Sequence, residues 1–306
     1  MVQASTVQAS AEAIHSLHAK LVDPSTSLPE KYRVMFSLRN VEGDLANKAL
    51  LQALKDSSAL FRHDVAFCLG QRQDKANMDV LARTLADPNE HAMVRHEAGE
   101  ALGAIGQEQC LDALRQHLQD GVKEVAETCQ LALQRIQYLK EHPDALNEES
   151  PYFSVDPVPA LPASTPTPEL RSLLLDESKR MFDRYSALFA LRNKGGAEAV
   201  CVLGEVFSKC SSALLKHEVA YVLGQMQDPA AVRFLTAVLQ DTAEHAMVRH
   251  EAAEALGAIA SDSTIQMLKD FAKDPEPIVA HSCVVALDML EFEKSGNFQY
   301  AQVGSA

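Results

Sequence analysis

Apolar residues recur along most of the chain with the spacing expected of helices that bury one face. In the segment 93–106 they form one stripe when each residue advances by about 100° around a helix axis. The residues of this stripe are Val94, Ala98, Ala101, Leu102 and Ile105. Segments of this kind alternate with polar breaks, some of which carry an Asp-Pro pair that separates one helix from the next. The pattern predicts paired helices, repeated roughly every 30–35 residues, and no β-strand.

A longer repeat divides the chain into two similar halves. Residues 90–106 return as residues 244–260 and match at 15 of 17 positions. Residues 60–71 are echoed in the same way by residues 214–225. Helix pairs that repeat at a fixed period stack into a solenoid, because each pair buries its apolar face only against its neighbours. We therefore expect an all-α fold, a HEAT-repeat α-solenoid of about eight helical hairpins, with about four in each half.

The segment between the two halves is rich in proline. Seven of the 13 prolines fall in residues 141–168, a density that interrupts helices and favours an extended linker. The expected organisation is an N-terminal HEAT-repeat half, the linker, a C-terminal HEAT-repeat half and a polar tail. Their bounds are 1–140, 141–168, 169–294 and 295–306.

Composition restricts the classes of partner and compartment. A formal net charge of −14 disfavours binding to nucleic acid or to an anionic membrane surface. No apolar run approaches the roughly 18 residues of a transmembrane helix, and the first residues lack the apolar core of a signal peptide. The cysteines show no C-x-x-C spacing, and Cys68, Cys129 and Cys283 fall inside apolar helical patterns as small reduced core residues. We expect a monomeric cytoplasmic protein.

Four pairs of histidine and acid recur at matched spacing in the two halves. The pairs are His63-Asp64, His96-Glu97, His217-Glu218 and His250-Glu251. The histidines are 33 residues apart within each half, and equivalent histidines are 154 residues apart between the halves. Imidazole nitrogen and carboxylate oxygen are ligands that first-row transition metals take, iron included. Because His96 lies almost opposite the apolar stripe of its helix, we expect the histidines to leave the hairpin core and share one face of the solenoid.

The ligand set favours iron over zinc. Zinc sites prefer four tetrahedral ligands, often thiolates, and no cysteine is placed to supply one. Two histidines with one carboxylate leave positions open on the metal, as in the facial triad of non-haem iron(II) oxygenases. We expect one triad from each half, and two halves that face each other across a two-iron centre. The triads are His63, His96 and Glu97 in the first half, and His217, His250 and Glu251 in the second.

The residues beside the triads suggest how a substrate is held. Asp64 and Glu218, the acids outside the triads, are suited to binding a substrate ammonium group. A glycine also follows each histidine by seven residues, two helical turns further along the same face: Gly70, Gly103, Gly224 and Gly257. Such glycines either leave space for a long side chain or allow close packing of neighbouring helices. His91 and His245, at the start of their helices, are interpreted as helix-entry residues.

At this level of detail the sequence resembles the deoxyhypusine hydroxylase family. The V-R-x-x-A-x-x-A-L-G frame is general to HEAT-like repeats, whereas the His-Glu inside it, as in 93–106 and 216–228, is specific. The resemblance covers nearly the whole chain outside the termini and the linker. It implies a di-iron monooxygenase that hydroxylates the deoxyhypusine side chain of a eukaryotic translation factor to hypusine. Such an enzyme uses two Fe²⁺ ions, O₂ and two electrons from a donor, with a peroxo-di-iron centre as the catalytic group.

The resemblance also assigns roles to individual residues. The iron ligands it implies are His63, His96, Glu97, His217, His250 and Glu251. The substrate path it implies passes the carboxylates Asp64 and Glu218 together with Gly70, Gly224 and Met247. One residue departs from the family pattern, because Asp64 stands where the family has glutamate. Aspartate is one methylene shorter and retracts the charge by about 1.5 Å. If Asp64 contacts the substrate, a bridging water can make up this distance. If Asp64 is an iron ligand, the two metal sites are unequal.

Three other functions stay open. A non-enzymatic HEAT-repeat scaffold would use the histidines as part of a solvated, charged face that binds other proteins. A bilin lyase-like protein shares the repeat frame but has no need of four histidine-acid pairs. A zinc hydrolase is disfavoured by the number of ligands. The iron content of the purified protein separates the enzyme from the scaffold.

Overall fold

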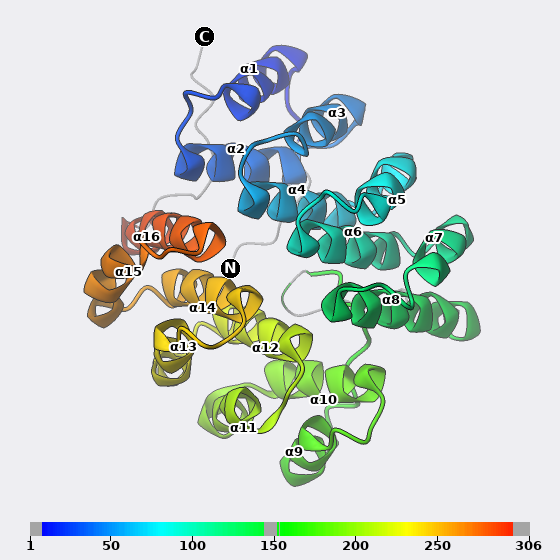
Figure 1. Ribbon diagram of the computed structural model, residues 1–306, viewed down its shortest axis with the longest axis vertical. Coiled ribbons are helices and arrows are strands. Elements are labelled where there is room, and N and C mark those ends of the chain that lie inside the picture. Colours follow the sequence, from blue (N-terminus) through cyan, green and yellow to red (C-terminus); the bar gives the residue numbers. More distant parts are fainter. Residues whose placement is uncertain (1–7, 144–151, 153, 296–306) are drawn as a thin grey trace. The chain divides into compact units, whose positions relative to one another are not determined.

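The computed structural model describes residues 8–143, 152 and 154–295, and the regular structure of this part of the chain is helical, with no β-strand (Figure 1). The described residues divide between Pro157 and Val158 into two compact units. Each unit contains four helical hairpins, so the expected all-α fold of about eight hairpins is confirmed. Within the same residues, no helix is both long enough and apolar enough to cross a lipid bilayer.

The first unit contains helices α1 to α8 (Figure 1). In each hairpin an odd-numbered helix packs on the even-numbered helix that follows it, and the even-numbered helices also pack on one another in order. The even-numbered helices therefore form one continuous layer of the unit. The bounds are α1 Ala11–Val22, α2 Leu28–Asn40, α3 Asp44–Ala53, α4 Ala59–Gln71, α5 Met78–Ala86, α6 Ala92–Ile105, α7 Leu111–Gln116 and α8 Lys123–Glu141.

The second unit contains helices α9 to α16 and repeats this plan (Figure 1). Its even-numbered helices again pack in order, α10 on α12, α12 on α14 and α14 on α16. The duplication seen in the sequence is thus a duplication of the hairpin arrangement. The bounds are α9 Thr167–Leu175, α10 Met181–Lys194, α11 Gly196–Lys209, α12 Ala213–Met226, α13 Val232–Gln240, α14 Ala246–Ile259, α15 Ile265–Phe271 and α16 Pro277–Ser295.

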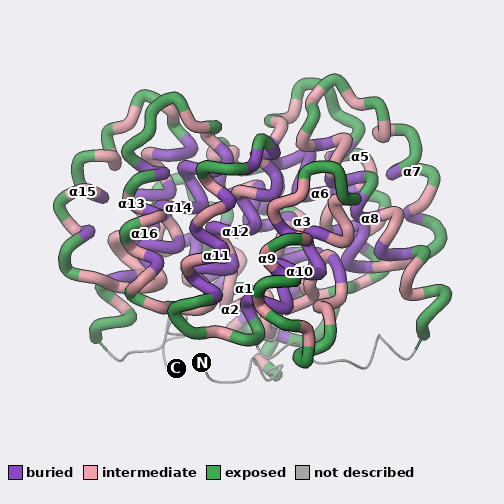
Figure 2. The backbone as a smooth tube through the Cα atoms, turned by 90° about the horizontal axis from the view of Figure 1, so that it is seen from below, coloured by how far each residue is buried: buried purple, intermediate pink, exposed green. Residues whose placement is uncertain are grey.

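Burial differs between the two layers of each unit. Buried residues, purple in Figure 2, run along nearly the whole of α6 and α14. Their hairpin partners α5 and α13 bury only two and three residues. The apolar stripe predicted in α6, which runs from Val94 to Ile105, is at most 5% exposed. Cys68, Cys129 and Cys283 are fully buried free thiols, as predicted.

Helix starts follow from side chains that accept hydrogen bonds from the backbone. Ser58 and Ser212 cap α4 and α12, the helices that carry the first histidine of each half. His91 and His245 cap α6 and α14, because Nδ1 of each ring accepts a hydrogen bond, at 3.3 Å, from the amide two residues later. The interpretation of these two histidines as helix-entry residues is therefore confirmed.

The four glycines that follow the histidines lie where even-numbered helices cross. A Cβ on Gly70 would lie 2.8 Å from Cα of Ala101, and one on Gly103 would lie 2.7 Å from Cβ of Ala132. In the second unit, Gly224 meets Ala255 and Gly257 meets Ala286 in the same way. A Cβ at Gly70, Gly103 or Gly257 would force the neighbouring helix to shift, and one at Gly224 would be tight, with contacts at 3.0 and 3.1 Å. Of the two explanations left open by the sequence, close helix packing is correct.

A buried arginine ties consecutive hairpins together in each unit. In α6, Nε of Arg95 donates to the carbonyl of Leu85 at 2.9 Å and Nη2 to Oδ2 of Asp120 at 2.5 Å. In α14, Arg249 bonds the carbonyl of Leu239 at 3.2 Å and Asp274 at 2.6 Å. The arginine thereby bonds a carbonyl at the end of the preceding helix and a carboxylate in the turn inside the next hairpin.

The proline-rich segment is fastened to both units where it is described. Amide and carbonyl of Val155 both bond the Gln71 side chain, and Nε of Arg135 donates to the carbonyl of Asp156. Further along, the amide of Leu161 donates to the carbonyl of Ser186 at 3.1 Å. Residues 144–151 and 153 of the predicted linker lie outside the described residues, as does the predicted tail beyond Ser295. The domain bounds given above stay a prediction.

Candidate metal centre

The first triad assembles on two neighbouring helices of the first unit. His63 lies on α4, and His96 and Glu97 lie on α6, which packs against α4. The two histidines occupy equivalent positions of successive hairpins, so their rings stand nearly parallel, with centroids 5.9 Å apart and planes 30° apart. Each of the three residues offers one ligand atom, and these atoms lie within 4.8 Å of one another.

One carboxylate oxygen of Glu97 faces both rings. Its Oε2 atom lies 3.3 Å from Nε2 of His63 and 3.6 Å from Nε2 of His96. The exposed fractions are 4% for His63, 0% for His96 and 4% for Glu97. Two imidazole nitrogens and a carboxylate oxygen thus converge away from solvent, which is the donor set of a transition-metal ion.

The opposite nitrogen of each ring contacts a polar side chain. Nδ1 of His63 lies 2.9 Å from Oδ1 of Asp64, and Nδ1 of His96 lies 2.9 Å from the hydroxyl oxygen of Thr128 on α8. Contacts of this kind orient the ring and leave Nε2 to face the metal. The rings of the first triad therefore have the support that is usual behind metal-binding histidines.

The charges of this cluster attract a cation. Burial alone would lower the pKa of His63, but its hydrogen bonds to Asp64 and Glu97 and their negative charges raise it well above its ordinary value. The pKa of Glu100 is raised to about 8, because burial and the charge of Glu97 disfavour ionisation. In the ion-free protein, a proton taken up by His63 would offset part of this negative charge. A divalent ion would take over that function.

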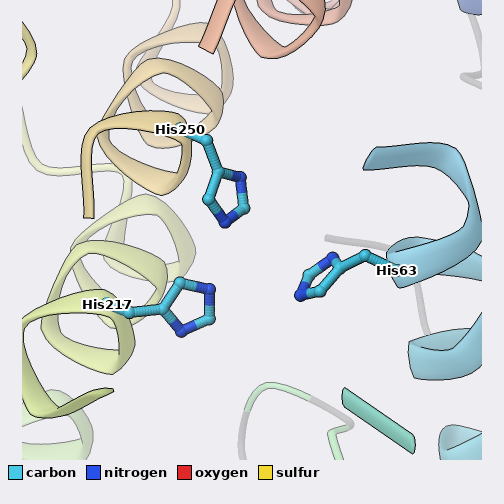
Figure 3. Close-up of side chains that lie close together, drawn as sticks. All are labelled: His63, His217 and His250. Carbon is cyan, nitrogen blue, oxygen red and sulfur yellow. The ribbon is translucent and has the colours of Figure 1, made fainter. Parts of the chain in front are cut away.

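The second unit repeats the arrangement on α12 and α14. Nε2 of His217 lies 3.4 Å from Oε2 of Glu251, and the ring centroids of His217 and His250 are 5.3 Å apart. Figure 3 shows these two rings extending from α12 and α14 toward the same side of the two helices. Nδ1 of His250 contacts the Ser282 hydroxyl on α16 at 3.4 Å, and Ser282 donates to Glu254 at 2.9 Å.

The structure changes the picture of the histidine face. The histidines are in equivalent helical positions, as the spacing predicted, but none is more than 6% exposed. This burial argues against the solvated, charged face of the scaffold alternative. Asp64, Glu218 and Met247 are also buried, with exposed fractions of 8%, 4% and 1%. Gly70 and Gly224 lie at helix crossings instead, and their place on a substrate path stays a prediction.

Several residues of the cluster were missed by the sequence analysis. Thr128 and Ser282 each lie 32 residues after the histidine whose Nδ1 they contact, so the repeat itself could have identified them. Tyr32 donates a hydrogen bond to Asp64 and belongs to a segment, 32–40, that returns as 185–193. Sequence spacing alone gives no signal for this contact, because Tyr32 and Asp64 meet only after α2 packs on α4.

Comparison with known proteins agrees with the fold and with the donor set. A family model of HEAT repeats matches residues 47–134 and 200–288. The deoxyhypusine hydroxylase of Mus musculus is 49% identical over 290 residues, which cover 95% of this chain and 95% of the relative. That of Danio rerio is 50% identical over 284 residues and 92% of each chain.

A solved structure extends the agreement to three dimensions. The structure of human deoxyhypusine hydroxylase in complex with glycerol is 48% identical and matches with a TM-score of 0.87. The match covers 92% of this chain and 96% of that chain. Identity at this level over nearly the full length, with the same HEAT-repeat architecture, places the chain in the deoxyhypusine hydroxylase family.

Proposed function

We propose that this protein hydroxylates deoxyhypusine with two iron ions, one bound by the triad of each half. The reaction follows from family membership, since the mouse, zebrafish and human relatives are deoxyhypusine hydroxylases. The metal assignment is supported by the converging nitrogen and oxygen atoms of the first unit. The proposed ligands are His63, His96 and Glu97 for one ion, and His217, His250 and Glu251 for the other.

The single observation that carries the assignment is the position of Oε2 of Glu97 between two imidazole Nε2 atoms. A set of two nitrogens and one carboxylate oxygen fits Fe²⁺ and leaves coordination positions open. Structural zinc sites are usually closed by four ligands, often thiolates. The first triad, His63, His96 and Glu97, contains no cysteine, so iron fits its donor set better than zinc does.

Iron bound there would activate O₂ for hydroxylation of an unactivated carbon. The residues of the chain supply the rest. The carboxylates Asp64 and Glu218 are candidates either to bind the ammonium groups of the substrate or to support the neighbouring metal ligands. Burial of the histidines keeps bulk water from the reacting groups, which protects an oxidising site from side reactions. Two electrons would come from an external donor.

The proposed protein substrate is a eukaryotic translation factor that carries deoxyhypusine. The net charge of −14 suits a cationic side chain, because opposite charges accelerate encounter and favour binding. We place the reaction in the cytoplasm, where the monomeric enzyme would meet the factor. Neither nucleic acid nor a membrane is required for this step.

Iron content and product formation test the proposal together. The protein is loaded with Fe²⁺ without oxygen, freed of excess metal and analysed for iron. It is then given oxygen, a reductant and the deoxyhypusine-bearing protein, and hypusine is measured by mass spectrometry. We expect about two irons per chain and hydroxylated product. His96→Ala and His250→Ala should each lose iron, whereas His15→Ala, which changes an exposed histidine of α1, should keep both ions.

The scaffold alternative makes the opposite prediction. A scaffold with vestigial histidines would retain no iron after anaerobic loading and form no product. If His96→Ala and His250→Ala both hold two irons, the ligand assignment is wrong even when the enzyme is active. If the protein binds iron but forms no hydroxylated product, the proposed substrate is wrong and the proposed metal centre still stands.

A further inference from the structure

Three buried residues of the first unit form one chain of hydrogen bonds. The hydroxyl of Tyr32 donates to Oδ2 of Asp64, and Nδ1 of His63 bonds the other oxygen, Oδ1, at 2.9 Å. The exposed fractions are 3% for Tyr32, 8% for Asp64 and 4% for His63. Asp64 is therefore a buried carboxylate placed between a hydroxyl group and the ring of a metal-binding histidine.

The packing of Tyr32 fixes one end of this chain. Its ring lies on α2 and contacts Phe61 and Phe36, with ring centroids 5.5 Å and 6.2 Å away. Helix α2 also packs directly against α4, which carries both Asp64 and His63. The phenol is thus held by its ring, and its hydroxyl holds the carboxylate that contacts His63.

The chain determines which nitrogen of His63 is available to a metal. A carboxylate accepts hydrogen bonds and cannot donate one, so the proton in the His63–Asp64 bond is on Nδ1. The neutral ring then carries its lone pair on Nε2. That atom lies 3.3 Å from Oε2 of Glu97, within the proposed metal site.

The second unit differs from the first at the equivalent positions. Tyr185, which corresponds to Tyr32 in the repeat, donates to the backbone carbonyl of Leu214 at 3.1 Å. The residue equivalent to Asp64 is Glu218, which is one methylene longer.

We propose that Asp64 and Tyr32 are positioning residues that orient His63 toward the metal. This inference rests on the proposed function, since it requires that His63 binds a metal ion. A carboxylate behind a histidine ligand fixes the ring and makes it more basic. Removing such a partner typically weakens metal binding 10- to 100-fold.

Tyr32→Phe is the sharpest test, because it removes one hydroxyl and keeps the aromatic packing. We expect anaerobic titration with Fe²⁺ to show one of two sites weakened about 10-fold and the other unchanged. KM for the deoxyhypusine-bearing protein should stay constant at saturating iron. Tyr185→Phe, the matched control, should keep both affinities. Asp64→Asn is a second variant that retains the size of the side chain and should weaken the same site.

Nuclear magnetic resonance of the Zn²⁺-loaded protein gives a readout independent of activity. Long-range ¹H–¹⁵N spectra should show His63 with its proton on Nδ1 and the metal on Nε2. A proton on Nε2 of His63 overturns the proposal. A Tyr32→Phe variant with unchanged iron affinity and a raised KM also overturns it, because that result would make Asp64 a substrate contact. A wild-type chain that binds no iron overturns the proposed function as well, so the two failures are distinguishable.

Discussion

Nε2 of His63 and Oε2 of Glu97 lie 3.3 Å apart on neighbouring helices. Two acceptor atoms at this distance repel each other unless a proton or a metal ion lies between them. Burial opposes a charge on His63, yet its hydrogen bonds to Asp64 and Glu97 raise its pKa well above the ordinary value. Metal and proton therefore compete for the same nitrogen.

This competition predicts a pH-dependent iron affinity. Below the raised pKa of His63, binding one Fe²⁺ ion should release about one proton. The affinity for iron should therefore fall about tenfold for each unit by which the pH is lowered. Calorimetry in buffers of different ionisation enthalpy counts the protons. The Glu97→Gln variant should release fewer protons when it binds iron. An iron affinity that does not depend on pH would contradict the competition between metal and proton.

The same raised pKa has a consequence for the stability of the ion-free protein. A group whose folded-state pKa is raised stabilises the fold below its unfolded pKa and loses that contribution as pH rises through the folded value. The ion-free protein should therefore become less stable as the pH rises from about 6.5 toward the raised pKa of His63. Urea unfolding at a series of pH values measures the trend, and Glu97→Gln should weaken it.

Thr128→Val and Ser282→Ala should weaken iron binding in separate halves. Nδ1 of His96 contacts Thr128 at 2.9 Å and Nδ1 of His250 contacts Ser282 at 3.4 Å. Because the first contact is shorter, Thr128→Val should cost about 10-fold in affinity and Ser282→Ala less. Thr84→Val removes a hydroxyl that bonds only the carbonyl of Val80 and serves as the control. Equal iron affinities in all three variants would exclude an orienting role.

Glu218→Gln should separate substrate binding from metal binding. The change removes a buried charge while keeping the size of the side chain. If Glu218 binds a substrate ammonium, KM should rise about 10-fold or more, and iron content should stay at its wild-type value. Glu198→Gln, at an exposed position of α11, controls for general charge effects. Loss of iron would make Glu218 a metal ligand.

Gly103→Ala should destabilise the first unit through overpacking. An added Cβ would lie 2.7 Å from Cβ of Ala132, where α6 crosses α8. We expect a loss of about 1–3 kcal/mol in the free energy of unfolding, measured by urea denaturation. Gly121→Ala is the matched control, because no atom lies within 4 Å of its added Cβ. Equal stabilities of the two variants would mean that the crossing is loose.

The Arg95–Asp120 pair should make the protein sensitive to acid. Burial alone would raise the pKa of Asp120, but the hydrogen bond from Arg95 and the amide of Val122 lower it overall. Its contribution is therefore present above pH about 3.8 and lost as the pH falls through the lowered folded-state value. Asp120→Ala should cost about 3 kcal/mol at neutral pH and flatten the acid limb of the stability curve.

The exposed pair Arg115–Asp112 is the control for this prediction. Both side chains are open to solvent, so water and salt screen their attraction. Arg115→Ala should leave the free energy of unfolding almost unchanged. A loss as large as that of Asp120→Ala would mean that burial of the Arg95–Asp120 pair is not what makes it important.

The sequence by itself determined the helices, the duplication and the register of the histidines. Helical periodicity is a local property, so the stripe that contains Val94 and Leu102 predicts which side of α6 is packed. The 33-residue spacing of His63 and His96 likewise predicts equivalent positions on successive hairpins. His91 and His245 were recognised as helix starts for the same reason, since caps act within one turn.

Only the tertiary structure decided how these residues meet. Whether Gly70 leaves a space or a contact depends on the distance between α4 and α6, which no local pattern encodes. The position of Oε2 of Glu97 between two rings depends on rotamers chosen by packing. Tyr32 and Asp64 lie 32 residues apart, and their hydrogen bond exists because α2 packs on α4. Sequence periodicity selects a helical face, whereas packing between helices selects the atoms that touch.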